Sequence, residues 1–119
     1  MHNFKQLQVW QMAMSMVKDI YVAISNFPPE EKYGLAQQLR RSAVSIPSNI
    51  AEGSGRNSAI DFARFLSIAN GSAYELETHL IICQEVGLLS ADDTHTIQIQ
   101  LEAVQKMITK LIQKFSQNK

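Results

Sequence analysis

Residues 97–115, IQIQLEAVQKMITKLIQKF, decide the fold class of this chain. Apolar side chains recur there at steps of four and three, and Gln, Glu and Lys occupy most positions between them. This spacing places the apolar side chains on one face of a helix with 3.6 residues per turn. The stripe consists of Ile97, Leu101, Val104, Ile108, Leu111 and Phe115. The stretch predicts an amphipathic helix that buries this face against other parts of the chain.

Three earlier stretches have apolar side chains at the same helical spacing. The first lies near residues 10–24, the second runs from Pro29 or Tyr33 to about Gly53, and the third begins at Ser58. Their expected inner faces are Trp10, Ala13, Met14, Val17, Ile20, Tyr21 and Ile24; then Leu35, Leu39, Ala43, Ile46 and Ile50; then Phe62, Phe65, Leu66, Ala69, Leu76, Leu80 and Cys83. The sequence therefore predicts an all-α protein with four helices.

Three short breaks separate these helices, at residues 26–29, 52–57 and 87–90. Ser58 and Ser90 are each followed three residues later by an aspartate, a pattern typical of a helix N-cap. Short connections between long helices favour antiparallel neighbours. We therefore expect residues 1–119 to form one domain, an up-down four-helix bundle.

Two residues inside the expected helices require their own explanation. Pro47 has no amide proton and its ring clashes with the carbonyl four residues earlier, so we expect a kink between Ala43 and Pro47 in helix two. Gly71, followed by Ser72, lies midway along helix three. We interpret Gly71 as a position where a neighbouring helix approaches closely, at a propensity cost of about 1 kcal/mol.

Composition restricts the partners and the compartment. Lys plus Arg and Asp plus Glu are equal at 11 each, so the chain has no net charge to attract phosphate over long range. Cys83 is the single cysteine, which excludes an intramolecular disulfide and a cysteine zinc site. No apolar run is long enough to cross a bilayer, and the N-terminus lacks an apolar leader. We expect a cytoplasmic protein without a membrane partner.

The residues that could carry catalysis are poorly placed. His79 and Cys83 could share a helix face, but no third group is positioned to orient them. Glu75 and Glu77 point about 200° apart on a helix, and the Glu-x-x-His pair of di-metal bundles is missing. The glycine loop at residues 53–56 lacks the Lys-Ser/Thr of a phosphate-binding loop. The two remaining histidines, His2 and His95, add no further catalytic arrangement. We therefore expect no enzyme activity, cofactor, metal site or small-molecule substrate.

Some apolar residues lie outside the expected inner faces of helices two and three. These are Val44, Ile68, Ile82 and Val86. Exposed apolar strips of this kind mark partner surfaces, and the simplest partner is another copy of the chain. We therefore predict a homo-oligomer that uses these residues. The alternative is that helices two and three are simply more central in the bundle.

Four arginines, Arg40, Arg41, Arg56 and Arg64, form the remaining charged feature. Guanidinium groups suit phosphate oxygens, which makes these residues candidates for nucleic-acid contact. They could equally form ion pairs with carboxylates of the same or another subunit. No aromatic residues alternate with them to form a stacking platform for single strands.

A longer pattern of residues resembles a known family. It comprises LQVWQ at 7–11, FP at 27–28, YGL at 33–35, QLRRSAVSIPSNIAEGSGR at 38–56, Phe62, RFL at 64–66, IA at 68–69, GS at 71–72 and ELET at 75–78. The chain thereby resembles the four-helix-bundle proteins encoded in intervening sequences of bacterial 23S ribosomal RNA genes, also labelled S23 ribosomal proteins. The resemblance covers nearly the whole chain.

The resemblance implies an up-down bundle that assembles as a homopentamer. A related branch comprises accessory proteins of diversity-generating retroelements, whose basic barrel is thought to hold nucleic acid and a reverse transcriptase. By that likeness Arg40, Arg41, Arg56 and Arg64 are the positions nominated for contact with RNA or DNA. Two hypotheses follow: a nucleic-acid-binding accessory protein, or a protein-interaction scaffold whose arginines form structural ion pairs.

Overall fold

The computed structural model describes residues 3–117, which form four long helices. These are α1 (Gln8–Ile24), α2 (Leu35–Ser54), α3 (Ala59–Glu85) and α4 (Ala91–Ser116). Two short 3-10 helices, η1 (Phe4–Gln6) and η2 (Pro29–Glu31), precede α1 and α2. The molecule is a rod with extents of 49 × 20 × 20 Å.

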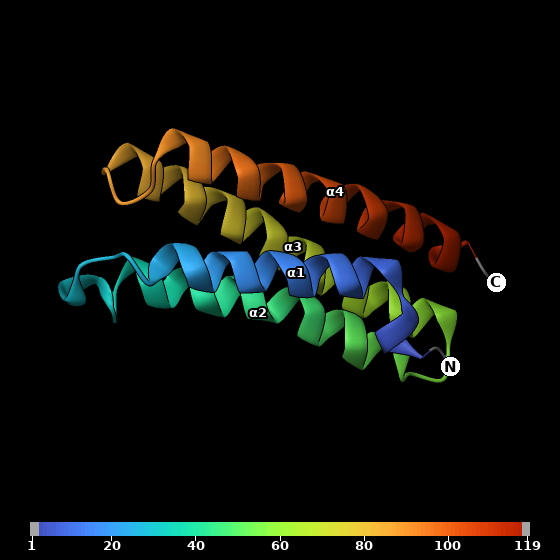
Figure 1. Cartoon of the computed structure of the whole chain (residues 1–119). Helices are drawn as coiled ribbons and strands as arrows, with labels where there is room; N and C mark the ends of the chain where they lie inside the picture. Colours follow the sequence, from blue (N-terminus) through green and yellow to red (C-terminus); the bar gives the residue numbers. More distant parts are fainter. Residues whose placement is uncertain (1–2, 118–119) are drawn as a thin grey trace.

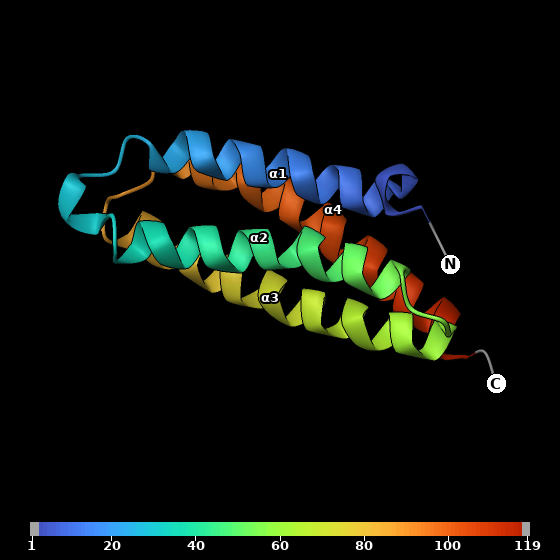
Figure 2. The same ribbon diagram turned by 90° about the horizontal axis from the view of Figure 1, so that it is seen from below.

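The four helices pack side by side around one core. Helix α1 contacts α2 and α4, and α3 contacts the same two helices, so each long helix has two neighbours. Consecutive helices run in opposite directions, and the start of α1 and the end of α4 lie at the same end of the rod (Figures 1 and 2). The predicted up-down four-helix bundle is thus confirmed. No helix within residues 3–117 is both long and apolar enough to cross a membrane.

The core contains the predicted faces of α3 and α4. All residues of the expected inner face of α3 are buried, and on α4 only Leu111 remains partly exposed. The stacked rings of Phe62 and Phe115, with centroids 4.9 Å apart, join the start of α3 to the end of α4. The period of the apolar side chains therefore located these two faces correctly.

The inner face of α1 is rotated from the predicted one. Val9 and Met16 are buried together with Ala13, Ile20 and Ile24. Met14 and Tyr21, which were expected inside, are 43% and 47% exposed. The apolar stripe of α1 is wider than the face that the core buries. Its remaining edge lies on the outer surface between α1 and α2.

Both predicted N-caps are present. The Ser58 Oγ accepts a hydrogen bond from the Asp61 amide at 3.1 Å, and the Ser90 Oγ accepts one from the Asp93 amide at 3.0 Å. Gly87, with φ of 82°, turns the chain after α3 so that the Leu88 amide donates to the Cys83 carbonyl. A left-handed residue at this position is the common way to end a helix, and glycine adopts it without strain.

Helix α2 differs from the prediction at its start. It begins at Leu35, later than expected, because Pro29–Glu31 forms the separate turn η2. Pro47 is buried inside α2, which continues past it as one helix to Ser54. The kink near Pro47 remains a prediction, since the continuity of the helix does not define its bend.

The glycines of α2 and α3 differ in how closely other parts of the chain approach them. A Cβ at Gly71 would meet no heavy atom within 4 Å, so the interpretation of Gly71 as a close-packing position inside the chain is wrong. A Cβ at Gly53 would lie 2.6 Å from the Phe65 Cβ. The close approach between α2 and α3 therefore occurs at Gly53.

Candidate functional site

The four nominated arginines fall into two pairs along the rod. Arg40 and Arg41 lie near the start of α2, whereas Arg56 follows its end and Arg64 lies in the first turns of α3. The 15 positions from Arg41 to Arg56 correspond to about 22 Å of helix. One subunit thus carries two separate arginine pairs.

The pair at the α2–α3 turn is bound to carboxylates. The Arg56 Nη2 lies 2.8 Å from the Glu52 Oε2, and the Arg64 Nη2 lies 2.8 Å from the Asp61 Oδ1. Both guanidinium groups also lie over the Phe65 ring, 4.6 Å and 4.7 Å from its centroid. Two positive charges are compensated locally by two negative ones, which suits a structural role.

The other pair has no carboxylate partner. The Arg40 Nη2 donates a hydrogen bond to the Lys32 carbonyl at 2.9 Å. Within residues 3–117, neither Arg40 nor Arg41 forms an ion pair. Both line a hollow of about 500 Å³ with Tyr21, Gln37, Val44 and Ser45. Their charges are available to an anionic partner.

The predicted interface residues do not form a single surface. Ile68 and Ile82 of α3 and Val86, the residue that caps its end, lie on one side and are 45%, 37% and 60% exposed. Gly71 lies on the same side, because it is three residues after Ile68 and eleven residues, about three helical turns, before Ile82. We call these four residues the α3 face. Val44, 39% exposed, lies instead on α2 beside α1.

Val44 belongs to an apolar groove that the sequence did not predict. A hollow of about 360 Å³ between α1 and α2 is lined by Trp10, Met14, Val17, Val44, Pro47, Ser48 and Ala51. Val44 also lines the hollow that contains Arg40 and Arg41, so the two hollows adjoin. We call the combined surface the α1–α2 groove. The signal in the sequence was the excess width of the α1 stripe.

The thiol and imidazole considered for catalysis lie at the packed boundary of α2 and α3. Cys83 is fully buried. Its burial, and to a smaller extent the negative charge of Glu31, raises the pKa of its thiol to about 11. The His79 Nδ1 lies 3.4 Å from the Ser42 Oγ, which itself donates to the Gln38 carbonyl. A protonated thiol that solvent cannot reach is a poor nucleophile. His2 lies outside the described residues.

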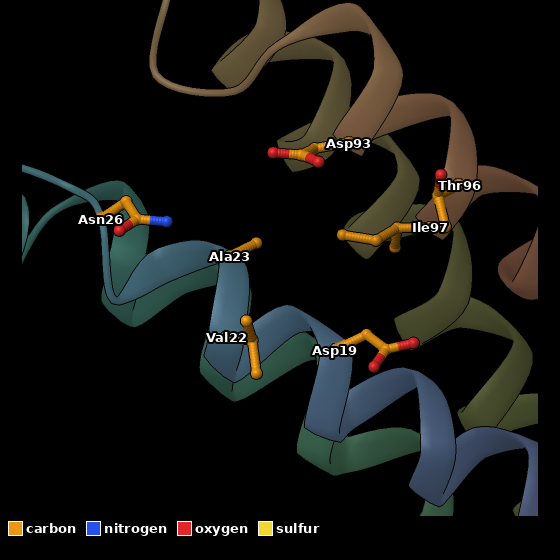
Figure 3. A pocket seen from close by; sticks show the side chains of 7 residues that line it. All are labelled: Asp19, Val22, Ala23, Asn26, Asp93, Thr96 and Ile97. Atoms are coloured by element: carbon orange, nitrogen blue, oxygen red, sulfur yellow. The ribbon is translucent and has the colours of Figure 1, made fainter.

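A further hollow lies between the end of α1 and the start of α4 (Figure 3). Its volume is about 430 Å³, and the carboxylates of Asp19 and Asp93 project from the two helices on either side of it. The Asp19 Oδ2 accepts a hydrogen bond from the Gln100 Nε2 at 2.8 Å. Across residues 3–117, no group of three or more His, Cys, Asp or Glu side chains is arranged to hold a metal ion.

The fold and surfaces define a class of protein: an up-down four-helix bundle with exposed apolar faces. The model of the 23S rRNA-intervening sequence protein family matches residues 5–110, and the chain belongs to that family. A solved structure of similar fold is a protein of unknown function from the S23 ribosomal protein family of Bacteroides thetaiotaomicron. Its TM-score is 0.79 at 23% identity, over 87% of this chain and 97% of that chain. A search of curated proteins found no match.

Proposed function

We propose that this protein is a non-catalytic bundle that works as an assembly of identical copies joined through the α3 face. The observation that carries the proposal is the combination of exposed apolar side chains with an uncovered glycine in the middle of a long helix. Ile68 and Ile82 are large apolar residues that the described chain leaves 45% and 37% exposed. Such a patch on a bundle surface is typical of a partner site.

Gly71 supports the same face. A glycine inside a helix costs about 0.5–1 kcal/mol relative to alanine, and here no neighbouring helix of the same chain approaches it. Contact with a helix of another copy would use the missing side chain, since the two backbones could approach closely there. The subunit number implied by the family resemblance, five, remains a prediction.

The test is the mass of the native protein and of two matched variants. Ile68→Glu places a charge on the α3 face, whereas Ile99→Glu places one at an exposed isoleucine of α4. We expect Ile68→Glu to release monomers at concentrations where the wild type and Ile99→Glu remain assembled. If both variants keep the wild-type mass while helicity is unchanged, the α3 face is not the interface.

A second candidate function is contact with RNA or DNA through Arg40 and Arg41. The observation that favours it is that these two guanidinium groups lie side by side in sequence, without carboxylate partners, on an open hollow. Assembly would repeat this weak pair in every subunit and make it multivalent. The alternative, a scaffold without nucleic-acid contact, is supported by the carboxylate pairing of Arg56 and Arg64.

Binding of labelled single-stranded and duplex RNA and DNA across a salt series tests this second candidate. The Arg40→Ala/Arg41→Ala variant should bind more weakly and flatten the salt dependence by about two phosphate contacts per subunit engaged. The Arg56→Ala/Arg64→Ala variant is the matched control and should bind as the wild type does. Absence of binding at low salt by an intact assembly would favour the scaffold.

A further inference from the structure

The α1–α2 groove has the form of a receptor for a helix. Trp10, Met14, Val17 and Tyr21 are spaced by four, three and four residues, so they form a straight edge along α1. This edge is about 16 Å long, three turns of helix. Met14 and Tyr21 are nearly half exposed, which leaves apolar surface open along its length.

The opposite edge of the groove, formed by α2, is apolar at one end and positively charged at the other. Val44, Pro47 and Ala51 of α2 make the Trp10 end apolar. At the Tyr21 end, Arg40 and Arg41 contribute two guanidinium groups that no carboxylate in residues 3–117 neutralises. The groove therefore combines an apolar floor with a cationic end.

We propose that the α1–α2 groove binds an amphipathic helix of a partner protein that carries acidic residues at one end. The apolar face of that helix lies along Trp10, Met14 and Val44, and its carboxylates meet Arg40 and Arg41. Amphipathic helices dock in apolar grooves through anchors at i, i+3, i+4 and i+7, which span about 10 Å and so fit within the length of this groove. The choice of an acidic end follows from charge complementarity with Arg40 and Arg41. This inference does not depend on assembly through the α3 face.

Trp10 supplies a direct reporter, because it is the only tryptophan of the chain and lines the groove. The probes are synthetic peptides of about five helical turns, without Trp or Tyr. All but one scrambled control share a leucine stripe, and two of these carry glutamates, at the N-terminal or the C-terminal end. One carries lysines instead of glutamates, and one has the same composition as an acidic peptide with the stripe scrambled.

We expect at least one acidic peptide to shift Trp10 emission to shorter wavelength with saturation, and the lysine and scrambled peptides to bind about tenfold more weakly or worse. Met14→Glu should abolish the response, whereas Ser15→Glu, an exposed neighbour on the other side of α1, should retain it. Arg41→Glu leaves one positive and one negative side chain at this end and should therefore remove the preference for acidic over lysine peptides. Circular dichroism confirms that each variant is folded.

Three outcomes would overturn the proposal. The first is equal affinity for the acidic and lysine peptides, and the second is a response that Met14→Glu leaves unchanged. The third is that a second copy of the chain already fills the groove. In that case Trp10 emission would move to longer wavelength on dilution, in step with a fall in mass, and no peptide would produce a saturable shift.

Discussion

Gly53 of α2 and Phe65 of α3 pack so closely that a Cβ added at Gly53 would lie 2.6 Å from the Phe65 Cβ. The same added atom would lie 2.9 Å from the Phe62 ring. Both phenylalanines are buried, and the Phe65 ring supports the guanidinium groups of Arg56 and Arg64. The end of α2 and the start of α3 therefore depend on a glycine at position 53.

Gly53→Ala should destabilise the protein by about 1–3 kcal/mol, because the new methyl group forces α2 and α3 apart. Urea unfolding followed by circular dichroism measures the change. Gly55→Ala is the matched control, since a Cβ at Gly55 would have only an ordinary contact at 3.6 Å. Equal stability of Gly53→Ala and the wild type would show that the two helices are not packed this closely.

Gly71→Ala should have effects of opposite sign on the single chain and on the assembly. The added methyl meets no atom of the chain and improves helix propensity, so the isolated chain gains about 0.5–1 kcal/mol. On the α3 face the same methyl hinders close approach of another copy and should lower the affinity between copies. Sedimentation velocity over a dilution series measures that affinity; an unchanged or tighter assembly would contradict the role assigned to Gly71.

Removing the charges of Arg56 and Arg64 should change stability only slightly. Both ion pairs are on the surface, with the arginine side chains 41% and 60% exposed, and such pairs contribute about 0.2–1 kcal/mol each. Thermal unfolding of Arg56→Ala/Arg64→Ala should therefore shift little. A loss far larger than the sum of two surface pairs would mean that their contacts with Phe65 are a major part of the packing at this end.

Cys83 should make the protein less stable in alkaline solution. The pKa of the buried thiol is raised to about 11, whereas an unfolded chain releases this proton near pH 9. Between these values the unfolded state has lost the proton that the folded state keeps, so stability falls as pH rises, by at most about 1.4 kcal/mol per pH unit. Cys83→Ala should remove this part of the decline; parallel curves for variant and wild type would contradict it.

The sequence predicted the helices and their N-caps better than the way in which the helices pack against one another. The stripe of α4 and the serines at positions 58 and 90 were sufficient to place two helices, because both signals are local. The orientation of α1 was missed: Met14 and Tyr21 continue the apolar pattern as regularly as Val9 and Met16, and only packing decides which edge is buried.

The candidate surfaces required the structure for a similar reason. Nothing in the sequence distinguishes Gly53 from Gly71 as the point of helix contact, since the neighbouring helix comes from elsewhere in the chain. The partners of Arg56 and Arg64, Glu52 and Asp61, lie only three or four residues away, and the sequence already offered ion pairs with carboxylates as an alternative for these arginines. Their shared position over Phe65, and the separation of Val44 from Ile68, depend on the tertiary arrangement.

The mass of the wild-type protein in solution decides whether the protein works as an assembly of copies. Sedimentation equilibrium at micromolar concentration should give a multiple of the 13.4 kDa chain mass, with a fivefold multiple matching the family resemblance. A mass of 13.4 kDa that stays constant up to about millimolar concentration would show that the protein is a monomer and does not work as an assembly.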